Sequence, residues 1–210
     1  MVNRGMLQTP AAKLWLLIFM AVLIWSAIAP YDRLTWWLEV APALIALVLL
    51  AITWQRFPLT TLLYVLILIH SLILMVGGHY TYARVPAFDW LRDTFELSRN
   101  HYDRVGHLAQ GFIPAMVARE LLLRLTPLKR GGWLFFLVLC VCLAISVVYE
   151  LIEWGAAMAL GGSAEEFLAL QGDEWDTQKD MALAGIGALV AQLSLARLHD
   201  RQLQQLRARL

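Results

Sequence analysis

The sequence contains little charge and almost no cysteine. Of its 210 residues, 16% are charged and 60% are hydrophobic, whereas a soluble domain is about a quarter charged and about half apolar. The net charge is +1, so no basic surface indicates a nucleic-acid partner. The two cysteines, Cys140 and Cys142, lie in an apolar run, where helical residues two positions apart point to different sides and cannot form a disulfide. Composition therefore excludes a disulfide-stabilised fold and a nucleic-acid-binding protein.

Several catalytic motifs are also missing. The chain has no HExxH motif, no P-loop and no GxSxG motif, and the acidic stretch GDEWDTQKD lacks the glycine and the spacing of an EF-hand loop. Apolar sequence, by contrast, is abundant, and the mean hydropathy is +0.63. It comes in blocks long enough to cross a bilayer, which takes ~20 residues per helix. Many of the nine tryptophans stand at block edges, as in the aromatic belts of membrane helices.

Six apolar segments are separated by prolines, glycines and charges. They lie at about 14–29, 37–54, 59–76, 105–125, 133–160 and 181–198. Segments of this length suit tilted transmembrane helices, which satisfy their own backbone hydrogen bonds in lipid. We therefore expect an all-α polytopic membrane bundle of about six transmembrane helices, forming a single integral membrane domain over residues 1–210.

The first segment also has features of a signal peptide, with a small-x-small pattern at Ala27–Ala29. Pro30 would directly follow the cut, and the rest of the chain is polytopic, so an uncleaved first helix is favoured.

Lysine and arginine are distributed unequally between the two sides of the membrane. With six helices both termini share a side, which collects eleven of the 17 basic residues, against six on the other side. The side with more basic residues is expected to be cytoplasmic. We therefore expect a multi-pass protein of the bacterial inner (plasma) membrane with both termini in the cytoplasm. The loops at 77–104 and 161–179 then face outward, and the basic stretch 197–210 extends the last helix toward anionic lipid headgroups.

Ionisable side chains collect at the outward-facing ends of the segments. Pairs spaced three or four residues apart share a helix face, and ionisable residues at membrane depth mark a functional site by default. The residues are Asp103 with His107, Glu150 with Glu153, Asp176 with Asp180, and His79 at the end of the third segment.

Carboxylate and imidazole groups are ligands for zinc, manganese, magnesium or iron. We expect a divalent metal ion held by His107, Glu150, Glu153 and Asp180, with Asp176 and His79 as further candidate ligands. The candidate catalytic residues are Glu150, Glu153, His107 and Asp103. A cation would offset the repulsion between the carboxylates.

The same residues also have interpretations without a metal. Arg104 or Lys179 would then be the counter-ion and the carboxylates would share a proton, as in a proton relay or acid–base catalysis. Structural interpretations are an ion pair of Asp103 with Arg99 or Arg104, and interface positions for His101 and Tyr102.

Several motifs together resemble the YjdF-like bacterial inner-membrane proteins, a family defined by a domain of unknown function. They are GGHYTYARVP, HYDRVGH followed by QGF and RELLLR, YELIEW, and GDEWDTQKDM with GIGA, and the resemblance covers about residues 10–200. It implies a multi-pass plasma-membrane protein without an established activity.

The architecture is also similar to that of VanZ-like membrane proteins, which are linked to glycopeptide resistance. Their DKxxH, ExxQ and acidic elements compare with Asp103–His107, Glu150 with Glu153, and Asp180 with the glycines that follow it. Arg replaces Lys and Glu replaces Gln in these elements.

The favoured function is a membrane protein with an acidic/histidine site at the outward-facing boundary. This site would support metal-assisted or acid–base chemistry on a lipid-linked or envelope substrate. The alternatives are a non-catalytic binding, assembly or resistance-type module, and a small proton-coupled transporter. A transporter requires a continuous polar path, and the apolar inner halves of the fifth and sixth segments offer little for one. The expected partners are membrane lipids and a small-molecule or lipid-linked ligand.

Overall fold

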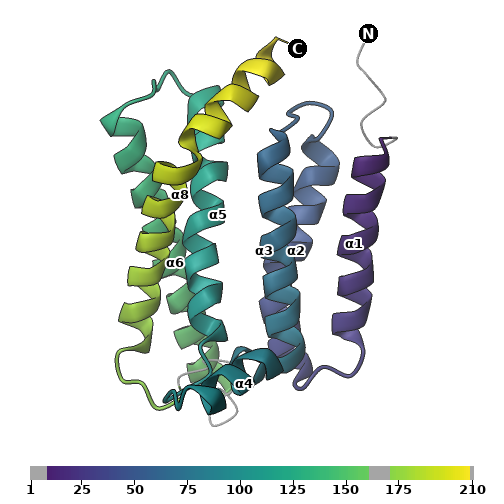
Figure 1. Ribbon diagram of the computed structural model, residues 1–210, viewed down its shortest axis with the longest axis vertical. Coiled ribbons are helices and arrows are strands. Elements are labelled where there is room, and N and C mark those ends of the chain that lie inside the picture. The colour runs from purple at the N-terminus through teal and green to yellow at the C-terminus, as the bar shows by residue number, and fades with distance from the viewer. Residues whose placement is uncertain (1–8, 161–170, 209–210) are drawn as a thin grey trace.

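The computed structural model describes residues 9–160 and 171–208, and all regular elements in these ranges are helical. In chain order they are α1 (Pro10–Ala27), α2 (Arg33–Thr53), α3 (Thr61–Tyr80), the 3-10 helix η1 (Tyr82–Arg84), α4 (Pro86–Thr94), α5 (Tyr102–Leu125), α6 (Gly132–Leu160) and α8 (Asp176–Arg207). The six long helices run alternately in opposite directions, so the start of α1 and the end of α8 lie at the same end of the bundle (Figure 1).

Local sequence signals explain where the first helices begin. Thr9 caps α1, because its hydroxyl accepts a hydrogen bond from the amide of Ala12 at 3.2 Å, and Pro10 occupies the first helical position. Asp32 caps α2 through a 2.7 Å bond from the amide of Thr35.

Each expected apolar segment corresponds to one long helix, but several helices continue into polar sequence. The last helix begins at Asp176 and ends at Arg207, well beyond the apolar stretch at 181–198. Within the described ranges, five helices are long and apolar enough to cross a membrane, and α5 is not among them. Charged and amide side chains interrupt α5, and they are tolerated because neighbouring helices bury much of its surface.

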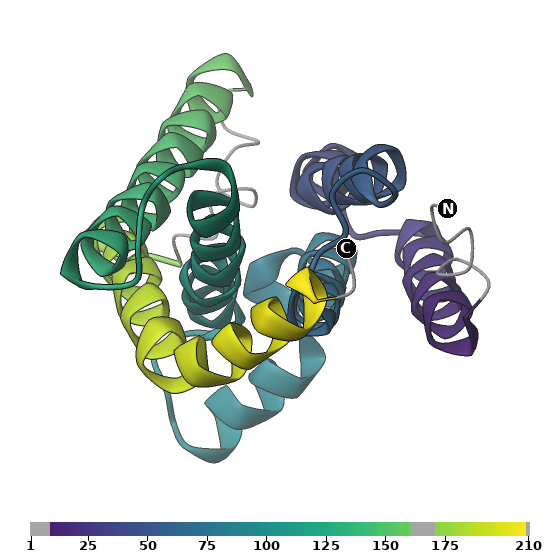
Figure 2. The ribbon, with the colours of Figure 1, turned by 90° about the horizontal axis from the view of Figure 1, so that it is seen from above.

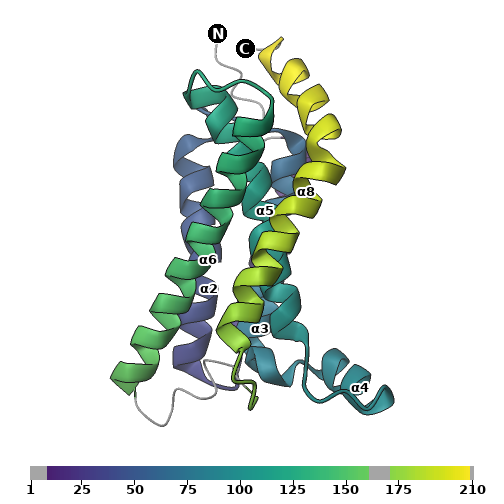
Figure 3. The same cartoon turned by 90° about the vertical axis from the view of Figure 1, so that its left-hand side faces the viewer.

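The amphipathic helix α4 lies inside the expected loop 77–104. It projects sideways from the bundle at the end opposite the termini (Figure 3). Its Trp90 side chain is 65% exposed.

The long helices form two groups joined through α3 and α5 (Figure 2). In one group α3 packs against α1 and α2, around Phe19, Val40 and Met75. In the other group α5, α6 and α8 pack together, and their core extends to α3 through residues such as Leu63 and Met116.

The closest approach is between α5 and α8. A Cβ atom on Gly111 would overlap the carbonyl oxygen of Ala184, and a Cβ atom on Gly187 would overlap that of Leu108. This contact brings the polar residues of the two helices within reach of one another.

A buried polar cluster joins α8 to α3 and α5 at the end that carries the termini. The fully buried Glu120 carboxylate accepts hydrogen bonds from Nε2 of His199 at 3.0 Å, from the hydroxyl of Thr60 at 2.8 Å and from Arg124 at 2.7 Å. Leu203, one turn after His199, is also buried. The end of α8 therefore packs partly on protein through His199 and Leu203, while Arg201 and Arg207 of the expected helical extension remain exposed.

Candidate functional site

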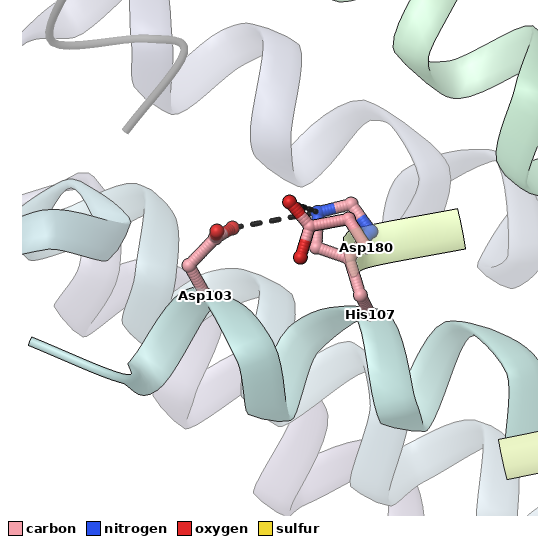
Figure 4. Close-up of side chains that lie close together, drawn as sticks. All are labelled: Asp103, His107 and Asp180. Atoms are coloured by element: carbon pink, nitrogen blue, oxygen red, sulfur yellow. Dashed lines mark ion pairs between the residues drawn. The ribbon is translucent and has the colours of Figure 1, made fainter. Parts of the chain in front are cut away.

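A histidine on α5 lies at the centre of the polar residues at the other end of the bundle. Nε2 of His107 is 3.4 Å from Oδ1 of Asp103, one turn earlier on α5, and 3.8 Å from Oδ2 of Asp180 on α8. One ligand atom from each of the three residues lies within 4.8 Å of the others, and all three residues are buried. Figure 4 shows both carboxylates facing the same nitrogen of the imidazole. We refer to Asp103, His107 and Asp180 as the triad.

The second ring nitrogen of His107 is oriented by Gln110. Nδ1 lies 3.1 Å from the side-chain oxygen of Gln110, which is an acceptor, so Nδ1 carries the proton and donates it. Nε2 is then the nitrogen that faces both aspartates. Glu150 on α6 completes the surroundings, with Oε1 at 3.8 Å from Nδ1.

Two arginines form ion pairs with the aspartates of the triad, at the carboxylate oxygens that do not face His107. Arg99 pairs with Oδ2 of Asp103 at 3.3 Å, which leaves Oδ1 toward His107. Arg104 pairs with Oδ1 of Asp180, which leaves Oδ2 toward His107. Each carboxylate therefore gives one oxygen to an arginine and turns the other toward Nε2.

The same arginines engage the acidic turn before α8. Both pair with Oδ1 of Asp176, and Arg104 also pairs with Asp173 at 2.9 Å. The hydrogen bond from Lys179 is the main cause that lowers the pKa of the Asp173 carboxyl, and the backbone amide of Trp175 and the charges of Lys179 and Arg104 add to it. Asp173 thus remains ionised and keeps Lys179 outside the triad.

His101 precedes α5 and takes no part in the triad. Partial burial, together with the charges of Arg99 and Arg104, lowers the pKa of His101, so its imidazole stays neutral near pH 7. Tyr102 was expected at the membrane interface, but its side chain is buried and its hydroxyl donates to the carbonyl of Ile73 at 2.9 Å. Packing against η1 and α4 explains this difference.

A cavity of about 200 Å³ adjoins the triad between α2, α3, α5 and α6. Asp103 and His107 form its wall on α5, Glu153 lines it from α6, and Glu39 lines it from α2. The hydroxyl of Tyr149 donates to Oε2 of Glu39 at 3.1 Å across the cavity.

The structure brings together most of the residues expected from the sequence. Asp103, His107 and Asp180 converge, Glu150 is in contact distance of His107, and Glu153 lines the adjoining cavity.

Two expected ligands lie elsewhere. Asp176 is held between Arg99 and Arg104. His79 lies at the contact of α3 with α1, where its Nδ1 is 3.1 Å from the carbonyl oxygen of Ser26 and its ring packs on Trp25.

Glu39 is the site residue that sequence reasoning missed. It is buried, with 4% of its surface exposed, and it stands alone among apolar residues between Leu38 and Leu50. A single carboxylate within a membrane-spanning segment is itself a signal of function. The lone carboxylate could therefore have identified Glu39 as a candidate from the sequence. Its position next to α6 could not have been predicted in this way.

Comparisons with known proteins agree with this membrane architecture. A family model described as "Predicted membrane protein (DUF2238)" matches residues 11–201. The inner membrane protein YjdF of Escherichia coli (strain K12) is 52% identical over 184 residues, which are 88% of this chain and 88% of that protein. No solved structure matches the chain. Together with the apolar helices, these findings confirm the prediction of an all-helical, multi-pass inner-membrane protein.

Proposed function

The chain belongs to the DUF2238 family of predicted membrane proteins, and we propose that its triad binds a divalent metal ion at one membrane boundary. The bound ion and the carboxylates beside it would serve chemistry on a lipid-linked or envelope molecule. The observation that carries this proposal is the convergence of Asp103, His107 and Asp180 within 4.8 Å beside a cavity.

The surroundings of the triad favour a metal. Metal-bound histidines characteristically donate their other N–H to an oxygen acceptor, which fixes the ring orientation, and Gln110 supplies that acceptor for His107. Arg99 and Arg104 orient the two carboxylates in the same manner. A mixed carboxylate and imidazole set suits zinc or manganese.

The charge balance favours a cation as well. Carboxylates outnumber basic groups among the described residues around the triad and its cavity. The acids are Glu39, Asp103, Glu150, Glu153, Asp173, Asp176 and Asp180, and the basic residues around them are Arg99, Arg104, His107 and Lys179. A divalent ion at the triad would offset part of this excess negative charge.

The nearby glutamates are suited to proton transfer. Glu150 is buried, and its Oε1 accepts no hydrogen bond from the described residues. Glu153 lines the cavity where a substrate group would lie. A metal ion would polarise an ester or phosphoryl oxygen, and these carboxylates would give or take the proton.

Metal binding by the purified protein tests this proposal. After treatment with a chelator, we expect titration calorimetry to show one equivalent of Zn²⁺ or Mn²⁺ bound, and elemental analysis to recover the ion. His107→Gln should abolish binding. His79→Gln is the matched control, because it makes the same change in a histidine outside the triad. Absence of binding to the wild type, or equal binding to both variants, would contradict the metal site.

A metal-free acid–base site is the second candidate, and one observation favours it. Each aspartate of the triad already has an arginine partner, so a proton on His107 would complete the neutralisation. Failure to bind metal, together with a protonated carboxyl band in the infrared spectrum that disappears in Glu153→Gln, would support this candidate.

A proton-coupled transporter receives less support from the described residues. On α5, Ile113 and Met116 lie in the apolar core between His107 and Glu120. The two polar regions at opposite ends of the bundle are therefore separated along this helix.

A further inference from the structure

Helices α2 and α6 face each other across the cavity without close packing. Among the described helices, α2 packs mainly on α3, whereas α6 packs on α5 and α8. The bond between Tyr149 and Glu39 links α2 and α6 at the polar end of the cavity. The space between the two helices therefore has an acidic end near the membrane boundary.

The wall on α2 changes from acidic to apolar along the helix. Glu39 and Pro42 line the cavity, and Ile45 and Leu49 follow three and seven residues after Pro42, on the same face. Ile45 is 58% exposed and Leu49 is 52% exposed. This face is thus uncovered toward the middle of the membrane.

The wall on α6 shows the same change. Glu153, Tyr149 and Ile145 line the cavity at four-residue intervals, and Val141 continues this face. Because α6 runs antiparallel to α2 (Figure 1), the acidic ends of both walls lie at the same membrane boundary. Ile145 and Val141 are 40% and 37% exposed. On both helices the face that lines the cavity is acidic at the boundary and continues deeper in the membrane as exposed apolar residues. We call the space between these two faces the groove.

We propose that this groove binds a membrane lipid with an ammonium headgroup, whose acyl chain lies between α2 and α6. Glu39 and Glu153 supply negative charge at the headgroup end, and neither forms an ion pair with a basic side chain of the described residues. Tyr82 and Tyr149 also line this end, and aromatic rings together with carboxylates are the usual surroundings of a bound ammonium group.

Charge and polarity select this ligand over others. An anionic headgroup would be repelled by the two glutamates. A water-soluble cation would gain nothing from the apolar faces of Ile45 and Ile145, whereas an acyl chain covers them. The lipid headgroup would share the cavity and Glu153 with the substrate group of the proposed function, but its binding requires no metal ion, because Glu39 and Glu153 lie outside the triad.

Photocrosslinking in nanodiscs tests the lipid site. The probes are phosphatidylethanolamine and phosphatidylglycerol, each with a diazirine in the acyl chain, and labelled residues are identified by mass spectrometry. We expect the ethanolamine probe to label the groove residues Ile45, Leu49, Val141 and Ile145 about tenfold more than the glycerol probe, which corresponds to ~1.4 kcal/mol. Leu193, an exposed residue on α8, should be labelled equally by both probes.

The double variant Glu39→Gln/Glu153→Gln provides the second measurement. It preserves side-chain shape, so the groove should remain while the preference for the ethanolamine probe is lost. Equal labelling of the wild-type groove by both probes would overturn the proposal, even if the double variant fails to fold. A preference that persists in a folded double variant would also overturn it.

Discussion

The buried His199 is restricted to one tautomer by its two neighbours. Nη1 of Arg119 lies 2.7 Å from its Nδ1, and because arginine only donates, Nδ1 must be the acceptor. Nε2 therefore carries the proton and donates it to Glu120 at 3.0 Å. This arrangement parallels that of His107, whose orientation is fixed by Gln110.

Removal of the Glu120 carboxylate should strongly destabilise the protein. Glu120→Ala leaves the buried donors of His199 and Thr60 without an acceptor and removes the carboxylate partner of Arg124, which keeps only the carbonyl of Pro58 as an acceptor among the described residues. Loss of one partner from a buried ionic cluster costs about 3 kcal/mol. The free energy of unfolding is measured by titration with sodium dodecyl sulfate in mixed micelles.

An exposed ion pair provides the control for Glu120. Asp93 contacts Arg92 at 2.9 Å, but 68% of its side chain is exposed, so Asp93→Ala should change the unfolding free energy by less than about 0.5 kcal/mol. Similar losses for both variants would show that the buried cluster does not stabilise the end of α8.

Individual site residues were predictable to different degrees. The four-residue spacing of Asp103 and His107 indicated a shared helix face, and the structure has it. Nothing in the local sequence of Asp176 distinguishes it from Asp180, yet two arginines engage it from outside α8.

At the level of elements, α5 carries two residues of the triad and packs against three other long helices. It contacts α3, α6 and α8, and Gly111 on α5 together with Gly187 on α8 lets these two backbones meet. Small residues permit such close contacts between membrane helices. This approach is what places Asp180 next to His107.

A methyl group at this contact should separate α5 from α8. Gly187→Ala would force the added carbon into the backbone of α5 near Leu108 and Phe112, and such overpacking costs about 1–3 kcal/mol. The displacement of α8 should also weaken binding of Zn²⁺ or Mn²⁺ at the triad.

Gly155 on α6 is the matched control for this substitution. No atom lies within 4 Å of a Cβ built there, so Gly155→Ala should leave the unfolding free energy unchanged or raise it by about 0.5–1 kcal/mol. If Gly187→Ala behaves like Gly155→Ala in both unfolding and metal titration, the close contact is not what assembles the site.

For the whole molecule, the alternating directions of the six long helices place the two ends of the described chain at the same end of the bundle (Figure 1). The triad lies at the opposite end, near the start of α5 and of α8. The excess of lysine and arginine on the side of the termini predicts that this side is cytoplasmic. The triad and its cavity would then open toward the periplasm.

Cysteine labelling measures this orientation. In a background with Cys140→Ala and Cys142→Ala, single cysteines replace Glu174 near the triad and Arg201 near the end of α8, both of which are exposed. A membrane-impermeant maleimide should label Glu174→Cys in intact spheroplasts and Arg201→Cys only after the membrane is permeabilised. The reverse pattern would place the site in the cytoplasm.

The sequence by itself determined the class of the protein and the ends of the helices where ionisable groups gather. Hydropathy, turn residues and three- or four-residue spacings are local properties, so they can be determined without a fold. The tertiary structure decided which groups meet, because this depends on the rotation of each helix about its axis and on how closely α5 and α8 approach. It joined Asp180 to Asp103 and His107, directed His79 to α1, and brought Glu39 across to Tyr149.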